Sequence, residues 1–148
     1  MENSNGRLHG YTKITSGFGY RKAPTGGAST YHSGIDIGAP AGSNIVAAFS
    51  GEVTFTGFKG ANGYSISVVN GNFTALYCHV DPSFIVKVGQ FVTRGQIIGK
   101  VGPKNVYGVP NNPYKDASGN PTNGATTGPH LHITIKKDNV NVNPLDYL

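Results

Sequence analysis

The stretch that decides the fold is TTGPHLHITIKK, residues 126–137, near the C-terminal end of the chain. From His130 onward, polar and apolar side chains alternate with a period of two residues, as they do in a half-buried β-strand. The apolar positions are Leu131, Ile133 and Ile135. Such a strand places the imidazoles of His130 and His132 side by side on its polar face. This arrangement indicates a site but does not define its chemistry.

The rest of the chain continues the β pattern. Its 148 residues include 22 glycines, about twice the ordinary share, and these glycines separate short apolar runs. The runs lie at residues 45–49, 53–55, 64–69, 73–78, 84–88 and 96–101. No stretch keeps a 3.6-residue apolar period long enough to predict a helix. We therefore predict a single, largely antiparallel all-β domain.

The predicted domain covers residues 14–148 and follows a polar arm at residues 1–13. Within it, residues 103–125 contain four prolines and no apolar alternation, which predicts a long loop. Loops of this length in compact domains are usually functional or disordered. The N-terminal sequence MENSNGRLHG has no apolar signal region. This predicts either a protein that leaves the cell without a cleaved signal or one domain of a longer chain.

Charge and hydropathy restrict the partners. The net charge of +5 favours anionic surroundings, but no basic stripe is interleaved with aromatic residues, which argues against nucleic acid. An anionic polymer such as a bacterial cell wall fits the same charge. No apolar run approaches the roughly 18 residues of a membrane span. We expect no nucleic-acid partner and no membrane insertion.

A second group of candidate ligands lies in YHSGIDIGAP, residues 31–40, where His32 and Asp36 flank Gly34. The glycine allows a loop to bend both side chains toward one ion. Two histidines and one aspartate satisfy zinc and leave a fourth position open, as in hydrolytic sites. Further histidines are then free for proton transfer or oxyanion stabilisation.

His79 is a third candidate, in FTALYCHV, residues 73–80. An extended run there places Tyr77 and His79 on one face and Cys78 on the opposite, buried face, which makes Cys78 a core residue rather than a nucleophile. The chain has no H-E-x-x-H helix that would supply a glutamate base. A hydrolase with this sequence would use histidine as its base.

Several motifs together resemble the lysostaphin/LytM-type zinc metallopeptidases, and the resemblance runs from about residue 14 to the last residue. The motifs are SGFGYR (16–21), HSGIDIGAP (32–40), SGEV (50–53), YCHV (77–80), VGQFVTRGQIIGKVG (88–102), TGPHLH (127–132) and VNPLDYL (142–148). The combination of H-x-G-x-D, Y-x-H and G-P-H-L-H is the specific part. The loop at 103–125 departs from the family by roughly twenty extra residues, and Thr126 replaces a usual serine.

The resemblance implies the duplicated hybrid-motif fold of these peptidases, with the site in a groove between loops. It implies one Zn²⁺ per chain held by His32, Asp36 and His132, with His130 as the general base. His79 would hydrogen-bond the oxyanion or share the proton transfer. The implied function is hydrolysis of peptide cross-links in bacterial peptidoglycan, at a glycyl bridge or a D-Ala-linked stem peptide. We expect a monomer or one domain of a larger chain.

Three alternatives remain beside this interpretation. One is an inactive family member that serves as a binding module, although this chain keeps all five functional positions. Another is a phosphoryl-carrying IIA-type sugar-permease domain, which also pairs H-x-G-I-D with a second histidine but has no place for G-P-H-L-H. The third keeps the peptidase activity and makes the chain a phage lysin or tail domain. The protein would then be phage-delivered rather than a host protein of the extracellular space or cell wall.

Overall fold

The structure is a computed structural model that describes residues 13–20 and 31–148. The polar arm predicted at residues 1–13 therefore lies outside the described residues except for Lys13, and Arg21 of the SGFGYR motif lies outside them as well. Within the described part, the helical elements are two short 3₁₀ turns at Gly60–Asn62 and Pro144–Asp146. No helix in this part of the chain is long and apolar enough to cross a membrane.

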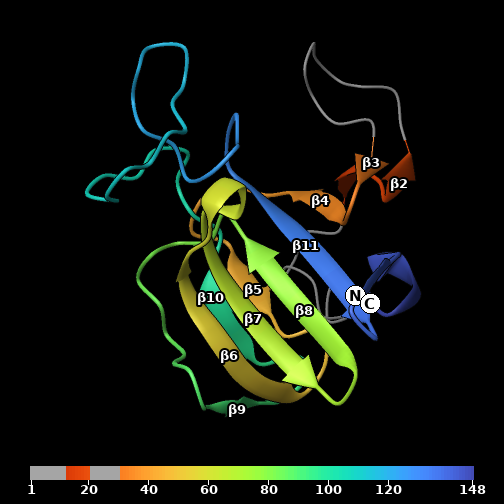
Figure 1. Cartoon of the computed structure of the whole chain (residues 1–148). Helices are drawn as coiled ribbons and strands as arrows, with labels where there is room; N and C mark the ends of the chain where they lie inside the picture. Colours follow the sequence, from red (N-terminus) through yellow and green to blue (C-terminus); the bar gives the residue numbers. More distant parts are fainter. Residues whose placement is uncertain (1–12, 21–30) are drawn as a thin grey trace.

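The described residues form one large antiparallel sheet and two small strand pairs (Figure 1). The large sheet runs in the order β1 (Ile14–Ser16), β4 (Ile35–Gly38), β11 (His130–Lys137), β8 (Phe73–Cys78), β7 (Tyr64–Asn70), β6 (Gly51–Phe58) and β9 (Phe91–Val92), and β12 (Val140–Val142) also pairs with β11. The small pairs are β5 (Asn44–Val46) with β10 (Ile97–Lys100), and β2 (Gly19–Tyr20) with β3 (Tyr31–His32). The prediction of a largely antiparallel all-β domain is confirmed.

Turn chemistry connects neighbouring strands of the sheet. Asp138 and Asn139 have φ angles of 53° and 64°, and they join β11 to β12 between the paired residues Lys137 and Val140. Two consecutive positive φ angles define the type I′ turn that suits two-residue hairpins, and Asp and Asn tolerate them better than most residues. The tight turn from β11 into β12 is therefore explained by the residue types at these two positions.

The core lies between the large sheet and the β5–β10 pair, which Figure 1 shows behind β6 and β7. Leu131, Ile133 and Ile135 of β11 are fully buried, as the alternation predicted. They join a cluster that includes Ile45 of β5 and Ile98 of β10. Burial at this scale stabilises the fold by about 25 cal/mol per Å² of apolar surface. The polar face of β11 is left to build a site.

Tyr77 and Cys78 are both fully buried, although they lie on opposite faces of β8, and only Tyr77 belongs to the hydrophobic core cluster. The Tyr77 hydroxyl accepts a hydrogen bond from the Ala48 N–H at 2.8 Å, which satisfies its polar atom inside the core. Burial raises the pKa of the Cys78 thiol to about 12. A thiol that stays protonated is a poor nucleophile, so the predicted burial of Cys78 is confirmed and its pKa argues against a nucleophile. The predicted face is wrong, because Cys78 pairs with His132 and lies on the polar face of the sheet, whereas Tyr77 pairs with Ile133 on the core face.

Candidate metal centre and active-site groove

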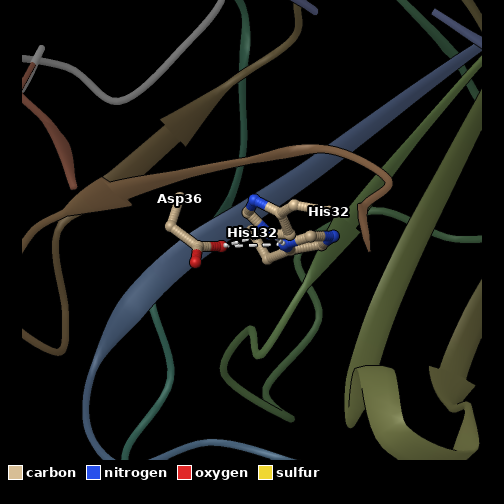
Figure 2. Close-up of side chains that lie close together, drawn as sticks. All are labelled: His32, Asp36 and His132. Carbon is tan, nitrogen blue, oxygen red and sulfur yellow. Dashed lines mark hydrogen bonds and ion pairs between the residues drawn. The ribbon is translucent and has the colours of Figure 1, made fainter. Parts of the chain in front are cut away.

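Three strands bring the candidate ligands together (Figure 2). Asp36 on β4 lies directly opposite His132 on β11 in the antiparallel register, and His32 ends β3 just before the bend into β4. Two cross-strand neighbours on one sheet face have side chains about 5 Å apart. The pairing of β4 with β11 therefore unites residues that are 96 positions apart in the sequence.

The ligand atoms of this trio fit a zinc ion. His132 Nδ1 lies 2.8 Å from Asp36 Oδ1, His32 Nε2 lies 3.4 Å from the same oxygen, and the two ring nitrogens are 3.2 Å apart. Donor atoms bound to one tetrahedral zinc at about 2.0–2.1 Å are roughly 3.3 Å from each other. The three atoms already have this spacing, so the residues present can hold the metal with little rearrangement.

The outer hydrogen bonds of the two histidines orient their rings toward the metal position. His32 Nδ1 is 2.8 Å from the Gly17 carbonyl oxygen, which can only accept, so Nδ1 carries the proton and Nε2 presents a lone pair. His132 Nε2 is 3.1 Å from the Thr134 hydroxyl. Partners of this kind fix the tautomer of metal-binding histidines. His132 Nδ1, which faces Asp36 Oδ1 at 2.8 Å, is the nitrogen of this ring that would bind a metal.

Asp36 is ionised in this setting. Burial raises its pKa, but the adjacent imidazoles of His132, His32 and His130 outweigh this effect and hold the pKa well below its usual range. A carboxylate that stays charged at neutral pH can bind a cation without first losing a proton. The local electrostatics therefore suit a metal ligand.

A close backbone contact explains why a glycine, Gly34, stands between His32 and Asp36. A Cβ atom at this position would lie 2.2 Å from the carbonyl oxygen of Ile133 and 2.9 Å from the Thr134 hydroxyl. Only glycine allows the bend to approach the β11 backbone this closely. The motif thus needs Gly34 for backbone contact with the strand that carries His132.

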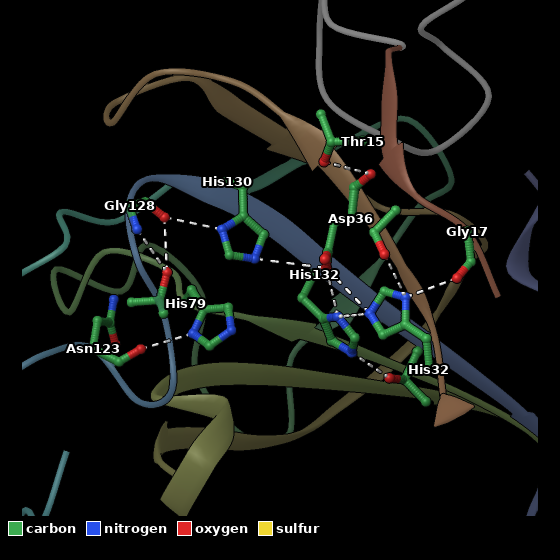
Figure 3. A network of polar contacts seen from close by, with 12 residues as sticks. Thr15, Gly17, His32, Asp36, His79, Asn123, Gly128, His130 and His132 are labelled. Atoms are coloured by element: carbon green, nitrogen blue, oxygen red, sulfur yellow. Dashed lines mark hydrogen bonds and ion pairs between the residues drawn. The ribbon is translucent and has the colours of Figure 1, made fainter. Parts of the chain in front are cut away.

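His130 and His79 lie beside the trio (Figure 3). His130 Nδ1 is 2.9 Å from the Gly128 carbonyl oxygen, and His79 Nδ1 is 2.7 Å from the Asn123 carbonyl oxygen. Because a carbonyl only accepts, both rings carry their proton on Nδ1 and expose an Nε2 lone pair. His130 Nε2 is 3.6 Å from Asp36 Oδ1, and the centroids of the two rings are 5.0 Å apart.

The backbone at His79 differs from the prediction. The sequence predicted an extended run through residue 79, but β8 ends at Cys78 and His79 has a φ of 60°. Hydrogen bonds hold it there, since its N–H donates to the Asn62 carbonyl and its own carbonyl accepts from Gly102 N–H, both at 2.9 Å. Non-glycine residues in this left-handed region are uncommon and cluster at functional sites. His79 therefore does not share the strand face of Tyr77.

Burial lowers the pKa of His79 to about 4, although its hydrogen bond to the Asn123 carbonyl favours the charged form. The imidazole is therefore neutral at pH 7, and its Nε2 atom can accept a proton. A neutral imidazole with a lone pair on Nε2 can accept a hydrogen bond or a proton. The five residues chosen from the sequence thus lie together in one cluster.

An open groove of about 830 Å³ passes the cluster. Asp36 and His130 line it, together with Thr15, Ser16 and Gly38 on the side of β1 and β4. The opposite wall comes from the long loop and the segment before β11, through Tyr114, Lys115, Thr122 and residues 124–129. Figure 1 shows this loop beyond the end of the sheet, next to the start of β11. The groove therefore opens onto the cluster at Asp36 and His130.

The long loop at residues 103–125 is folded on itself. Asp116 accepts hydrogen bonds from the backbone of Asn120 and Ser118 and from the Asn105 side chain, and it pairs with Lys104 at 3.3 Å. These contacts lower the pKa of Asp116 to about 2, the Asn120 bond contributing most. Of the two tyrosines in this loop, Tyr114 lines the groove, whereas Tyr107 is 69% exposed. The loop is a wall of defined shape.

Sequence reasoning missed two residues of the site. Thr134 holds the ring of His132, and period-2 alternation already placed it on the same strand face, so a signal for it existed. Asn123 is fully buried and its carbonyl holds His79. It stands in an aperiodic, glycine- and proline-rich loop, and no local pattern distinguishes it from its neighbours.

The comparisons with known proteins identify the family. Residues 30–114, more than half of the chain, match the model of peptidase family M23. The chain belongs to peptidase family M23, a family of metallopeptidases. This confirms the resemblance to lysostaphin/LytM-type enzymes.

Three similar proteins extend the comparison. The DD-carboxypeptidase/endopeptidase Mpg of Neisseria meningitidis is 34% identical over 136 residues, which cover 91% of this chain and 27% of Mpg. Lysostaphin of Staphylococcus simulans is 30% identical over 129 residues, covering 85% of this chain and 22% of lysostaphin. The structure of a zinc-containing peptidase from Vibrio cholerae superposes with a TM-score of 0.73 at 27% identity, covering 94% of this chain and 38% of that one. This chain thus spans about a quarter of the length of these curated relatives.

Proposed function

We propose that this domain is a zinc-dependent endopeptidase that hydrolyses peptide cross-links of bacterial peptidoglycan. The observation that carries the proposal is the position of the His32–Asp36–His132 trio beside two further histidines on an open groove. Relatives named as a DD-carboxypeptidase/endopeptidase and a peptidoglycan DD-endopeptidase support the same substrate class.

In this proposal His32, Asp36 and His132 hold one zinc ion through Nε2, Oδ1 and Nδ1. A bound zinc would polarise a peptide carbonyl and lower the pKa of a water molecule. One carboxylate among three ligands leaves the centre a formal charge of about +1, which favours a developing oxyanion. The contact with the Gly17 carbonyl keeps His32 in the required tautomer, and the Thr134 hydroxyl orients the ring of His132.

His130 is the proposed general base. Its Nδ1 proton is committed to the Gly128 carbonyl, so Nε2 is the nitrogen that accepts a proton, and it lies beside Asp36. Its place two residues before His132 on the same strand face holds base and ligand in fixed register. Because His130 Nε2 is held 3.6 Å from the ligand atom of Asp36, the base would already be positioned next to a water at the metal site.

His79 is the proposed second acid–base residue. Its ring can accept at Nε2 a proton that originates from the water added across the peptide bond, because Nδ1 is committed to the Asn123 carbonyl. Once protonated, the same Nε2–H can donate to the substrate oxyanion or to the leaving amine. His79 is 7% exposed, which limits the contact of its ring with bulk water.

The cell wall is the proposed place of action, outside the cytoplasm, and the net charge of +5 favours attraction to anionic wall polymers, which salt should weaken. Delivery by a phage and action as a monomer stay predictions. The identity of the peptide bond that is cut also stays a prediction, because the metal centre would act on any peptide carbonyl. The groove walls decide that choice.

Digestion of purified walls tests the function. Walls from several Gram-positive and Gram-negative species, incubated with the zinc-loaded protein, are expected to release new amino termini and no new reducing sugar ends, because the attack falls on amide bonds. Mass spectrometry of the fragments then names the bond. Absence of free amines from every wall, together with labelling of a histidine by a phosphoryl donor, would show the carrier function instead.

Shortening the loop is expected to change substrate preference and leave zinc binding intact. Val106 N–H donates to the Pro121 carbonyl at 3.2 Å, so residues 107–120 can be replaced by Asn-Gly, the preferred two-residue hairpin turn. The variant loses Tyr114 and Lys115 from the groove wall but keeps Asn123. We expect the ratio of kcat/KM between glycyl and stem-peptide substrates to change, with about one zinc per chain.

Single substitutions control this experiment. Tyr114→Ala and Lys115→Ala are expected to reproduce part of the change in preference, because both side chains line the groove. Tyr107→Ala is the matched control, since this tyrosine is exposed and outside the groove lining. An unchanged preference in the shortened protein would contradict the assignment of this wall to substrate selection.

A further inference from the structure

Asn123 lies in an irregular loop, but each of its polar groups forms a hydrogen bond. Its side-chain oxygen accepts from Tyr64 N–H at 2.7 Å, and its amide nitrogen donates to the Val80 carbonyl at 3.0 Å. Its backbone N–H donates to the Lys104 carbonyl at 2.9 Å. The remaining backbone group, the carbonyl oxygen, accepts from His79 Nδ1 at 2.7 Å. Every polar group of this buried residue is satisfied, so its position is strongly determined.

The surrounding backbone is shaped around this amide. A Cβ atom on Gly63 would lie 2.3 Å from the Asn123 carbonyl oxygen and 2.4 Å from its side-chain oxygen. A Cβ atom on Gly102 would lie 2.7 Å from its amide nitrogen. Glycine at both positions lets the two chain segments close on the amide. The amide therefore occupies a fitted recess between segments that also flank His79.

The hydrogen bonds of Asn123 act on His79 both through its ring and through the backbone of the next residue. The Asn123 carbonyl binds the ring, and the Asn123 side chain binds the carbonyl of Val80, the next residue along the chain. Val80 N–H in turn donates to the Tyr64 carbonyl at 2.9 Å, beside the Tyr64 N–H that Asn123 accepts. Asn123 thus holds the ring of His79 and the backbone of the next residue, and His79 itself is in the left-handed region, a conformation that needs external support.

We propose that Asn123 is a positioning residue that fixes the ring orientation and the tautomer of His79, and through it the acid–base step of catalysis. The part concerning catalysis rests on the proposed function. Asn123 does not line the groove and acts only through His79. Its backbone link to Lys104 also makes the end of the long loop part of the catalytic framework, whereas residues 107–120 form the groove wall.

Two substitutions separate the contacts. Asn123→Ala removes both side-chain bonds and leaves the buried Tyr64 N–H and Val80 carbonyl without partners. Asn123→Asp keeps the size and the acceptor toward Tyr64 but places a carboxylate oxygen against the Val80 carbonyl. The Asp variant loses one bond of the recess instead of two, so it keeps the proposal testable if the Ala variant does not fold.

The first measurement is independent of activity. Long-range ¹H–¹⁵N spectra of the full chain, labelled at histidine, report which ring nitrogen carries the proton. We expect His79 to show the Nδ1-protonated pattern in the wild type and to lose it in both Asn123 variants. Asn112→Ala is the matched control, because the Asn112 amide bonds the Thr122 carbonyl in the same loop without contacting His79. An unchanged His79 pattern in a folded Asn123 variant would overturn the proposal.

The second measurement is a double-mutant cycle with His79→Ala. With His79 present, Asn123→Asp is expected to lower kcat about 10- to 100-fold, the scale of a displaced catalytic group, with little change in KM. In the His79→Ala background the same substitution is expected to change kcat less than about twofold. Equal losses in both backgrounds would show a purely structural role. If the wild type cleaves no wall peptide, the proposed function fails, and the tautomer spectra still decide whether Asn123 positions His79.

Discussion

The Asp36→Ala variant is expected to lose its zinc and, with it, measurable peptidase activity. Asp36 Oδ1 is the atom on which His132, His32 and His130 converge, at 2.8, 3.4 and 3.6 Å. Without the carboxylate, two neutral imidazoles remain and the site loses its only formal negative charge. Metal content by mass spectrometry or atomic absorption should fall from about one zinc per chain to near zero.

Chelation gives the reversible form of the same result. Removing zinc from the wild type should abolish cleavage of wall peptides, and adding Zn²⁺ should restore it in the wild type but not in Asp36→Ala. Asp146→Ala is a suitable control, because this carboxylate is exposed in the 3₁₀ turn at Pro144–Asp146. Full activity of metal-free wild-type protein would disprove the metal assignment.

The His130→Ala and His79→Ala variants are expected to keep zinc and lose turnover. Neither ring belongs to the ligand trio, so zinc content should stay near one per chain. The loss of one acid–base or oxyanion group typically costs roughly 10²-fold or more in kcat. Both variants should show this loss in kcat on a defined peptide, measured with the zinc content of the same sample.

The matched comparison is His132→Ala, which changes the same residue type two positions along the same strand. It is expected to lose zinc, because its Nδ1 atom belongs to the trio. Loss of zinc in His130→Ala and its retention in His132→Ala would mean that the two roles are reversed. The pair thus separates a ligand from a base on neighbouring positions of one strand face.

Some features of this protein follow from short-range patterns alone. Alternation after His130 determined that Leu131 and Ile133 enter the core, because a strand turns successive side chains to opposite faces. The same periodicity put His130 and His132 on one face, and the H-x-G-x-D spacing placed His32 near Asp36. Each of these inferences needs only the geometry of a few consecutive residues, and the structure confirms the alternation and brings the four polar residues together.

Other features required the tertiary structure. The pairing of Asp36 with His132 joins strands from distant parts of the chain, and the register that aligns them is a property of the assembled sheet. His79 left its predicted strand because Asn62 and Gly102, which no local pattern connects to it, bind its backbone. Asn123 reaches His79 across 44 positions. Contacts of this range leave no periodic trace in the sequence, because packing of the folded chain alone decides which backbone groups meet.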